Sequence, residues 1–183
     1  VNSSEGYVLT VTPDQVLIRA TSGAGLFYGV QTMLQMADEK GLPVGIITDE
    51  PRFAYRGFMM DVSRHFFNKE FIKKQMDALA YYKLNRLHLH LTDAAGWRIE
   101  IKKYPRLTEF AAWREFPTWK EWWNNGRRYE EEGSKDAHGG YYTQDDIREL
   151  VAYAQERFIT VIPEIEMPAH SEEVLTAYPA LSC

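Results

Sequence analysis

The sequence predicts an α/β fold in which strands alternate with helices and the strands run parallel. From Arg86 to Thr92, leucine alternates with histidine or threonine, which is the period of a strand with one apolar and one polar face. Short apolar runs at residues 57–62 and 159–164 precede and follow this strand, each separated from it by a stretch of helical periodicity. Repeated strand and helix units of this kind favour a parallel sheet with right-handed crossovers.

The composition is that of a globular chain with one sizeable core. Of the 183 residues, 45% are hydrophobic and 14% are aromatic. The net charge is −5 and the basic residues are scattered, so the chain offers no continuous basic face for nucleic acid or an anionic membrane. A small neutral or cationic ligand fits this balance better. No apolar run approaches the roughly 20 residues that span a bilayer, so we expect no membrane span.

The ends of the sequence carry two further expectations. The first residue is Val1 rather than Met, so we expect the chain to begin inside a longer precursor. Cys183 is the one cysteine, which excludes an internal disulfide and does not indicate a redox compartment.

Residues 1–50 are predicted to be the C-terminal part of a small α/β domain. Two β-rich runs at 7–11 and 16–20 flank a Pro-Asp turn, which predicts a hairpin. Residues 22–37 have the apolar spacing of an amphipathic helix, with Gly41 as its stop. A further strand at 44–48 then leads into a charged, proline-containing boundary.

Residues 51–183 carry the strand and helix repeat. Asn68 is a predicted N-cap of a helix that Asn85 closes, and Thr143 is a predicted N-cap of a second helix. A third helix is expected to start at Ser171. A closed barrel of eight strands takes about 250 residues. The repeat is therefore either a small open sheet or the first part of a barrel.

Four motifs carry a family resemblance, at residues 56–67, 84–98, 138–143 and 162–170. Together they resemble the catalytic barrel of the β-N-acetylhexosaminidases of glycoside hydrolase family 20, and residues 6–36 resemble the end of the small domain before it. The resemblance implies an α/β chain in which residues 51–183 are the truncated N-terminal portion of a catalytic (β/α)8 barrel of the TIM type. The implied substrate is a terminal N-acetylhexosamine on an oligosaccharide or glycoconjugate, and no cofactor or metal is implied.

The resemblance also implies roles for three residues. Arg56 matches the family arginine that hydrogen-bonds hydroxyls of the terminal sugar, and a guanidinium suits a pair of ring hydroxyls. Asp93 and His170 match the aspartate and histidine that form a polar network behind the catalytic acid. A carboxylate that holds a histidine fixes its tautomer and keeps it protonatable.

Some positions depart from the usual family pattern. Ala94 and Ala95 replace Asp-Gln, Glu166 and Ala169 replace Asp and Gly, and Phe158 stands where glycine is frequent. Because the remainder of each motif is retained, these departures bear on substrate preference more than on the reaction.

The catalytic pair of the family does not occur in this sequence. Family enzymes carry adjacent Asp and Glu residues in a His-x-Gly-Gly-Asp-Glu motif, whereas His138-Gly139-Gly140 is followed by two tyrosines. In the family the substrate's acetamido oxygen attacks the anomeric carbon, the glutamate protonates the leaving oxygen and the aspartate orients the acetamido group, a substrate-assisted retaining route. We therefore expect the pair downstream of Cys183, no catalytic residue in this chain, and no activity from the fragment alone.

Glu164 and Glu166 are the first alternative source of an acid pair. On one face of a strand they would lie about 6.6 Å apart, close to the spacing of inverting glycosidases. Two acids side by side on one strand cannot flank a glycosidic bond, so we expect them to form a buried, hydrogen-bonded barrel layer with His88 and His90 instead.

Two alternatives come from other functional classes. Metal-dependent amidohydrolases present two imidazoles from one strand to zinc, as His88 and His90 would, with His138 and His170 as further ligands. The second alternative is a non-catalytic carbohydrate-binding fragment. All five tryptophans lie in or beside residues 93–140, where they either stack on sugars or anchor a long loop, in part on a short helix.

A half-barrel would also expose an unpaired strand edge and an apolar inner face. We therefore expect a second copy of the chain as a partner, through self-association at the open barrel face. By family alone, the parent protein is expected to be periplasmic or secreted.

Overall fold

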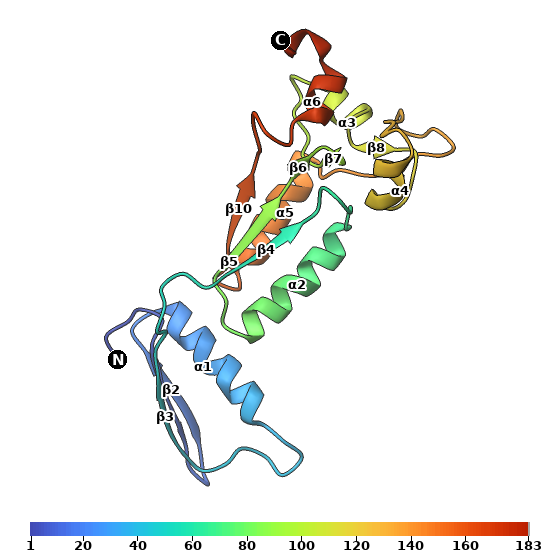
Figure 1. Ribbon diagram of the computed structural model, residues 1–183. Coiled ribbons are helices and arrows are strands. Elements are labelled where there is room, and N and C mark those ends of the chain that lie inside the picture. The colour runs from blue at the N-terminus through green and yellow to red at the C-terminus, as the bar shows by residue number, and fades with distance from the viewer. Residues whose placement is uncertain (183) are drawn as a thin grey trace.

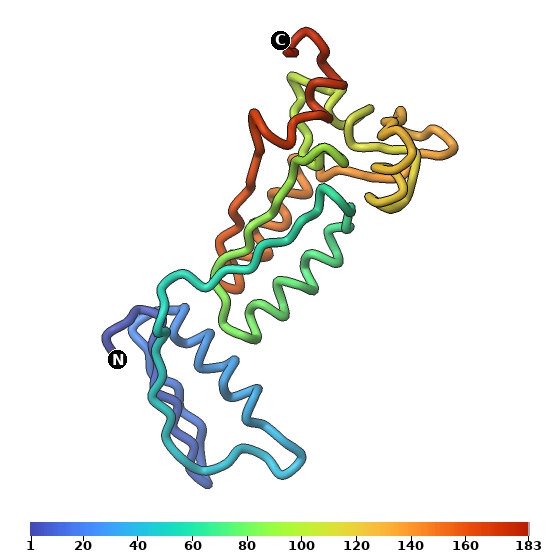
Figure 2. Tube along the Cα trace, viewed as in Figure 1, coloured from blue at the N-terminus to red at the C-terminus, as the bar shows by residue number. Residues whose placement is uncertain are grey.

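The structure, a computed structural model, describes residues 1–182; Cys183 lies outside that range. Two α/β parts follow one another along the long axis of the molecule (Figure 1). Figure 2 shows the chain starting beside the smaller part and ending at the far tip of the larger one. None of the helices in residues 1–182 has the length and apolarity needed to cross a membrane.

The smaller part is an antiparallel sheet covered by one helix. Its strands are β1 (Tyr7–Val11), β2 (Val16–Ala20) and β3 (Gly45–Asp49), in the order β2-β1-β3, and its helix is α1 (Gly23–Met36). The predicted hairpin, helix and third strand are confirmed. The prediction for Gly41 is wrong, because α1 already ends at Met36 and Gly41 serves the next turn with a φ of 105°.

The larger part repeats strand and helix in parallel. Its main elements are β4 (Gly57–Asp61), α2 (Lys69–Tyr81), β5 (Arg86–His90), α5 (Gln144–Gln155) and β10 (Thr160–Glu164). The strand order is β10-β5-β4, with β5 in the centre and both pairings parallel. Both helices cover one face of this sheet (Figure 1), so Leu87 and Leu89 are buried under them. The parallel repeat is the one the sequence predicts.

Side-chain caps begin both helices of the larger part. Asn68 Oδ1 accepts a hydrogen bond from Phe71 N at 2.9 Å. Thr143 forms a reciprocal capping box with Asp146. The predicted role of Asn85 is wrong: α2 ends at Tyr81, and Asn85 is instead buried at the start of β5, where its Oδ1 accepts from Arg56 N at 3.0 Å.

Residues 92–140 form an excursion above the carboxyl ends of the strands. It contains β6 (Thr92–Asp93), β7 (Gly96–Trp97), α3 (Arg106–Glu109), β8 (Trp113–Arg114), α4 (Trp119–Asn124) and β9 (His138–Gly139). After β10 the chain returns to this region with α6 (Glu172–Ala177) and the 3-10 turn η1 (Pro179–Leu181). Trp122 is fully buried, whereas Trp119 and Trp123 are exposed. Trp122 therefore fits the expected role of a loop anchor, whereas Trp119 and Trp123 leave ring faces exposed to solvent.

Polar and aromatic contacts join the two parts. Lys83 Nζ donates to Tyr7 OH at 2.7 Å and to Asp49 Oδ2 at 3.0 Å. Phe158, which has a φ of 56°, lies 5.4 Å from Phe27 of α1 between ring centroids. A positive φ is the conformation that glycine adopts without cost, which is a physical reason for glycine to be frequent at this position.

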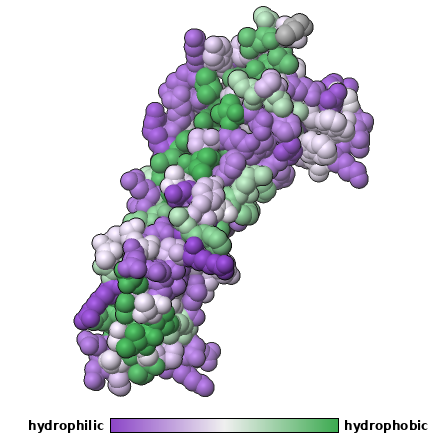
Figure 3. Space-filling view, turned by 60° about the vertical axis from the view of Figure 1, so that its left-hand side comes forward, coloured by the Kyte–Doolittle hydropathy of each residue, from purple (hydrophilic) through white to green (hydrophobic). Residues whose placement is uncertain are grey.

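The sheet face opposite α2 and α5 has no covering layer in residues 1–182. The edge strands β4 and β10 each pair on one side only. This face was expected to be apolar, but it is mixed: Met59 is 54% exposed, and His88 and Glu164 pair beside it. Figure 3 likewise shows hydrophobic patches interrupted by polar residues along the larger part.

Candidate functional site

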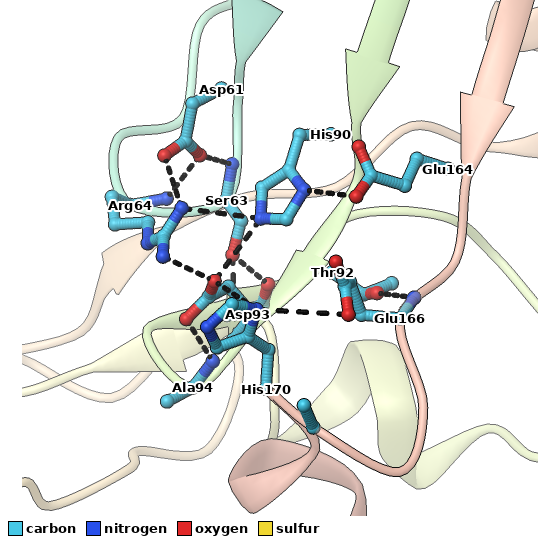
Figure 4. A network of polar contacts seen from close by, with 12 residues as sticks. Asp61, Ser63, Arg64, His90, Thr92, Asp93, Ala94, Glu164, Glu166 and His170 are labelled. Atoms are coloured by element: carbon cyan, nitrogen blue, oxygen red, sulfur yellow. Dashed lines mark hydrogen bonds and ion pairs between the residues drawn. The ribbon is translucent and has the colours of Figure 1, made fainter.

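The carboxyl ends of the three parallel strands bring two carboxylates and one imidazole to the same edge of the sheet. Asp61 of β4, His90 of β5 and Glu164 of β10 are register neighbours. The loops that follow these strands add Arg64, Asp93 and His170, as Figure 4 shows. In parallel α/β folds this end of the sheet is where functional side chains gather.

Asp93 is the centre of the network. The residue is 3% exposed, and its Oδ1 accepts from the backbone N of Ala94 at 2.7 Å. Its Oδ2 lies 2.6 Å from Arg64 Nη2, 3.1 Å from His90 Nε2 and 3.4 Å from His170 Nδ1. A buried carboxylate needs such partners to persist, and here they come from three different segments.

His170 meets Asp93 from the loop after β10. Its side chain is 49% exposed, so the part of the ring away from Asp93 is open toward solvent. Its φ is 52°, a backbone conformation that costs a non-glycine residue about 1–3 kcal/mol and is most frequent at functional sites. The structure therefore brings together Asp93 and His170, two of the three residues that the sequence analysis singled out.

His90 and Glu164 form a pair of imidazole and carboxylate next to Asp93. His90 Nδ1 lies 3.0 Å from Glu164 Oε1, and His88 Nε2 lies 2.5 Å from Glu164 Oε2. Burial lowers the pKa of His90, but hydrogen bonds to Asp93 and Glu164 outweigh burial and raise it above the ordinary value. Burial also opposes ionisation of Glu164, yet the hydrogen bonds from His90 and its other neighbours leave the pKa of Glu164 below the ordinary value.

The expected cluster of Glu164 with His88 and His90 is confirmed, and Glu166 joins it from outside the strand, with a carboxylate oxygen within 4.8 Å of ligand atoms of His90 and Glu164. Strand β10 ends at Glu164, so Glu166 lies in the loop, where its backbone N donates to Thr92 Oγ1 at 2.9 Å. Its carboxylate is 3.7 Å from His170 Nδ1 rather than beside His88. Glu166 therefore approaches His90 and Glu164 from the loop after β10 and not from the face of the strand.

Arg56 is not part of this network, so the structure does not support its predicted contact with a sugar at this site. It precedes β4 and so lies at the opposite end of the sheet from Asp93. Its Nε donates to the carbonyl of Lys83 at 2.7 Å, and its Nη1 lies 2.8 Å from Glu5 Oε2. These contacts commit the guanidinium to the junction between the two parts of the molecule.

Arg64 is the arginine at the site, and sequence reasoning missed it. Its Nη1 donates to Asp61 Oδ2 at 2.8 Å, and its side chain is 37% exposed. The signal was present: Arg64 follows the carboxyl end of β4 by three residues, whereas Arg56 precedes that strand. Functional residues are expected at the carboxyl ends of the strands. The positions of Arg56 and Arg64 relative to β4 therefore indicate that Arg64 lies at the site.

A cavity of about 470 Å³ opens beside this network. Arg64, Asp93 and His170 line one part of it, and Trp119 and Trp123 line another. The two indole rings are stacked, with centroids 5.3 Å apart. A carboxylate, a guanidinium and exposed aromatic faces are the groups that bind a sugar through its hydroxyls and its apolar face.

The proposed pairing of His88 and His90 as metal ligands is not supported. Among residues 1–182, closely spaced ligand atoms group His90 either with Asp93 and His170 or with Glu164 and Glu166. His88 and His138 belong to neither group, since Glu164 separates the two strand imidazoles and His138 lies on β9. Arg64 also holds Asp93 at 2.6 Å, where a cation would have to replace it.

Comparison with known proteins places this geometry in a family. The family described as "Glycosyl hydrolase family 20, catalytic domain" matches residues 53–183, and its "domain 2" matches residues 1–50. The chain belongs to glycosyl hydrolase family 20. The α/β fold with parallel β-α units after a small domain is that of a partial barrel of this family.

Curated relatives from this family are similar along nearly all of the chain. A β-hexosaminidase of Porphyromonas gingivalis is 47% identical over 190 residues, which cover 98% of this chain and 22% of the relative. A β-hexosaminidase of Akkermansia muciniphila is 42% identical, covering 98% of this chain and 35% of the relative. The chain therefore spans about a fifth to a third of the length of these relatives.

Solved structures of the family agree with the fold. A family 20 exo-β-N-acetylglucosaminidase from Vibrio harveyi, in complex with N-acetylglucosamine, has a TM-score of 0.84 and 39% identity over 98% of this chain and 28% of its own. An N-acetyl-β-hexosaminidase from Streptomyces plicatus also has a TM-score of 0.84 and 39% identity, covering 98% of this chain and 35% of its own.

Proposed function

We propose that this chain is the first part of a β-N-acetylhexosaminidase that removes terminal N-acetylhexosamine from glycans by substrate-assisted retaining catalysis. In this proposal, residues 1–50 end the small domain and residues 51–183 begin the catalytic barrel. The observation that carries it is the contact of Asp93 with both Arg64 and His170 beside a tryptophan-lined cavity. The family relatives that bind N-acetylglucosamine support the same substrate class.

Each of these residues has a proposed task. Arg64 donates hydrogen bonds to hydroxyls of the terminal sugar, because part of its guanidinium is exposed while Asp61 and Asp93 hold the rest. Asp93 fixes His170 through Nδ1, which leaves Nε2 to face the catalytic acid. Trp119 and Trp123 offer their ring faces to a sugar ring.

The chain alone is proposed to be catalytically inactive. The glutamate that protonates the leaving oxygen and its neighbouring aspartate have no counterpart in this sequence, which lacks the His-x-Gly-Gly-Asp-Glu motif. Loss of a general acid alone lowers a rate by roughly 10²- to 10⁴-fold. The polypeptide then holds part of the sugar site without the proton donor.

Hydrolysis of a chromogenic β-N-acetylglucosaminide tests the proposal. We expect no hydrolysis by the purified 183-residue chain, with or without EDTA. Activity that survives EDTA would show that a carboxylate of this chain serves as the acid, which contradicts the proposal. Activity that EDTA removes would instead favour the metal-dependent alternative.

A second candidate function is carbohydrate binding without catalysis. The stacked, exposed pair of Trp119 and Trp123 favours it, because these rings line the cavity with Arg64 and do not anchor the core. Saturable binding of N-acetylglucosamine by the chain, together with inactivity of the whole parent protein, would favour this function over the enzyme.

Self-association is a further proposal. The open edges of β4 and β10 and the exposed Met59 favour pairing with a second copy. Sedimentation tests it: a monomer at all concentrations, without ligand or partner, would contradict it. A periplasmic or secreted parent is proposed on family grounds, and fractionation of the source cells tests that.

A further inference from the structure

A second cavity, of about 330 Å³, lies on the other side of the loop after β4. Arg64 lines the cavity of the candidate site, whereas the next residue, His65, lines this one. Its other walls include Arg98, Arg114 of β8 and His138 of β9. The proposed function uses none of these four side chains.

Arg98 is a buried cation without an anionic partner. It is 1% exposed, and its side-chain donors go to backbone carbonyls. These carbonyls belong to Val62, Ser63, Ala95, Ala112 and Gly140. Burial, with repulsion from Arg114, lowers the pKa of Arg98 to about 9. The carbonyl dipoles hold the guanidinium in place but do not neutralise its charge.

Arg114 is a second buried cation nearby, and its hydrogen bonding is incomplete. It is 3% exposed; its Nε donates to Phe116 O at 3.0 Å and its Nη2 to Pro117 O at 2.9 Å. Its Nη1 is buried and has no hydrogen-bond partner among residues 1–182. A buried charged donor without a partner is costly, so such a group indicates a missing acceptor.

No carboxylate forms an ion pair with either of the two cations among residues 1–182, although Asp61 and Glu173 are near enough to raise the pKa of Arg98. The residues that line the cavity include no Asp or Glu, and neither Arg98 nor Arg114 forms an ion pair with a described residue. Two buried charges of one sign are disfavoured unless an opposite charge joins them. The exposed imidazoles of His65 and His138 add polar groups at the rim.

We propose that this cavity binds a small oxyanion with the chemistry of sulfate, phosphate or a carboxylate. The Nη1 group of Arg114 supplies the hydrogen bonds, Arg98 supplies further positive charge, and the two histidines enclose the ligand. An oxyanion fits better than a monatomic ion because a guanidinium presents paired donors to two oxygens. The proposal does not depend on the glycosidase function.

Titration with inorganic sulfate tests this proposal. Sulfate replaces chloride at constant ionic strength, and the Nε–Hε signals of the arginines of the 183-residue chain are followed by NMR. We expect a saturable shift of the Arg114 signal, which the Arg114→Lys variant identifies by its loss. A shift that grows linearly without saturation, or that leaves Arg114 unmoved, would overturn the proposal.

Variants separate a specific site from general stabilisation by sulfate. Arg114→Met is expected to weaken sulfate binding, measured by calorimetry, by about tenfold or more. Arg128→Met is the matched control, because Arg128 is exposed and paired with Glu115 at 2.6 Å. Equal affinity in wild type and Arg114→Met would refute the assignment.

Substitution of an exposed histidine at the rim tests sulfate binding without changing a buried residue. His138→Gln removes an exposed imidazole from the cavity and leaves both arginines in place. We expect weaker sulfate binding from this variant with unchanged thermal unfolding. Unchanged sulfate affinity in both His138→Gln and His65→Gln would contradict enclosure by the histidines.

A sulfated sugar distinguishes a free anion from an anionic group that is attached to a glycan. N-acetylglucosamine 6-sulfate is compared with inorganic sulfate and with unmodified N-acetylglucosamine. If the sulfated sugar binds more tightly than either, and Arg114→Met removes that advantage, the anion is a substituent of a glycan. If inorganic sulfate binds as tightly as the sulfated sugar, the anion is free.

Discussion

Arg64 Nη2 lies 2.6 Å from Asp93 Oδ2, so one ion pair ties the loop after β4 to the loop after β5. The same carboxylate oxygen is 3.4 Å from His170 Nδ1, in the loop after β10. Three segments that are distant in sequence therefore meet at one atom. A ligand that contacts Arg64 therefore contacts a residue that is paired with the carboxylate beside His170.

Arg64→Met is expected to weaken binding of N-acetylglucosamine to the chain by about tenfold, because it removes charge-assisted donors to the sugar hydroxyls. Saturation-transfer NMR measures the binding. Arg56→Met is the matched control: it removes the same group from the junction between the two parts, where Glu5 holds it. A larger loss of binding for Arg56→Met would restore Arg56 as the substrate contact.

Trp119→Ala and Trp122→Ala are expected to separate recognition from packing. Trp119 is 40% exposed at the cavity, so its loss should weaken sugar binding and leave the unfolding free energy nearly unchanged. Trp122 is fully buried, so its loss should lower the free energy of unfolding by about 3–5 kcal/mol. Urea unfolding and sugar titration of both variants check this, and unchanged sugar binding in Trp119→Ala would assign Trp119 to packing.

Patterns within one segment predicted the elements of this fold well. The alternation around Leu87 and Leu89 gives a strand whatever surrounds it, and Asn68 and Thr143 cap helices through contacts three residues away. The same reasoning was wrong for Asn85, which was predicted to end α2, because its hydrogen-bond partners at Ala54 and Arg56 are about thirty residues away in sequence. A residue type favoured at a helix end is equally suited to a buried junction.

The candidate site was predictable only in part. Asp93 and His170 both follow strand ends, so the rule for parallel sheets places them together. Arg56 was misplaced because the motif contains two arginines, and only the strand boundary tells them apart. The unpaired Nη1 group of Arg114 could not be foreseen, because its hydrogen bonding depends on how the whole of residues 92–140 is arranged in space.

The pair of His90 and Glu164 is expected to make stability depend on pH. The raised pKa of His90 contributes stability that is complete below the unfolded value of about 6.5 and is lost as pH rises through the folded value. The lowered pKa of Glu164 contributes stability above about 4.3 and loses it as pH falls through the folded value. The pair therefore stabilises most between these limits.

Urea unfolding of His90→Gln at pH 5.5 and pH 8.5 checks this expectation. The variant should lose about 1–3 kcal/mol relative to wild type at pH 5.5 and less at pH 8.5. His138→Gln is the control, since this imidazole is exposed and forms no ion pair with a described residue. A deficit for His90→Gln that grows toward pH 8.5 would mean that the neutral imidazole is the stabilising form.

Glu173 of α6 is expected to destabilise the chain at alkaline pH. It is fully buried, and neither of its carboxylate oxygens has a hydrogen-bond partner among residues 1–182. Burial, with the nearby charge of Asp93, raises its pKa to about 8. Because the folded chain holds this proton more tightly than the unfolded chain, stability should fall as pH rises from about 4.3 toward the folded value.

Glu173→Met is therefore expected to stabilise the chain by about 1–4 kcal/mol at pH 8, because an apolar side chain of similar size replaces an uncompensated buried charge. The gain should shrink at pH 4, where the wild-type carboxyl is protonated in the folded state and mostly protonated in the unfolded state. Glu172→Met is the matched control, since Glu172 is only partly buried and pairs with Arg127 at 2.9 Å. Chemical unfolding across this pH range measures the difference. A less stable Glu173→Met at pH 8 would mean that the ionised carboxylate is stabilised inside the fold, and that α6 docks against a positive charge.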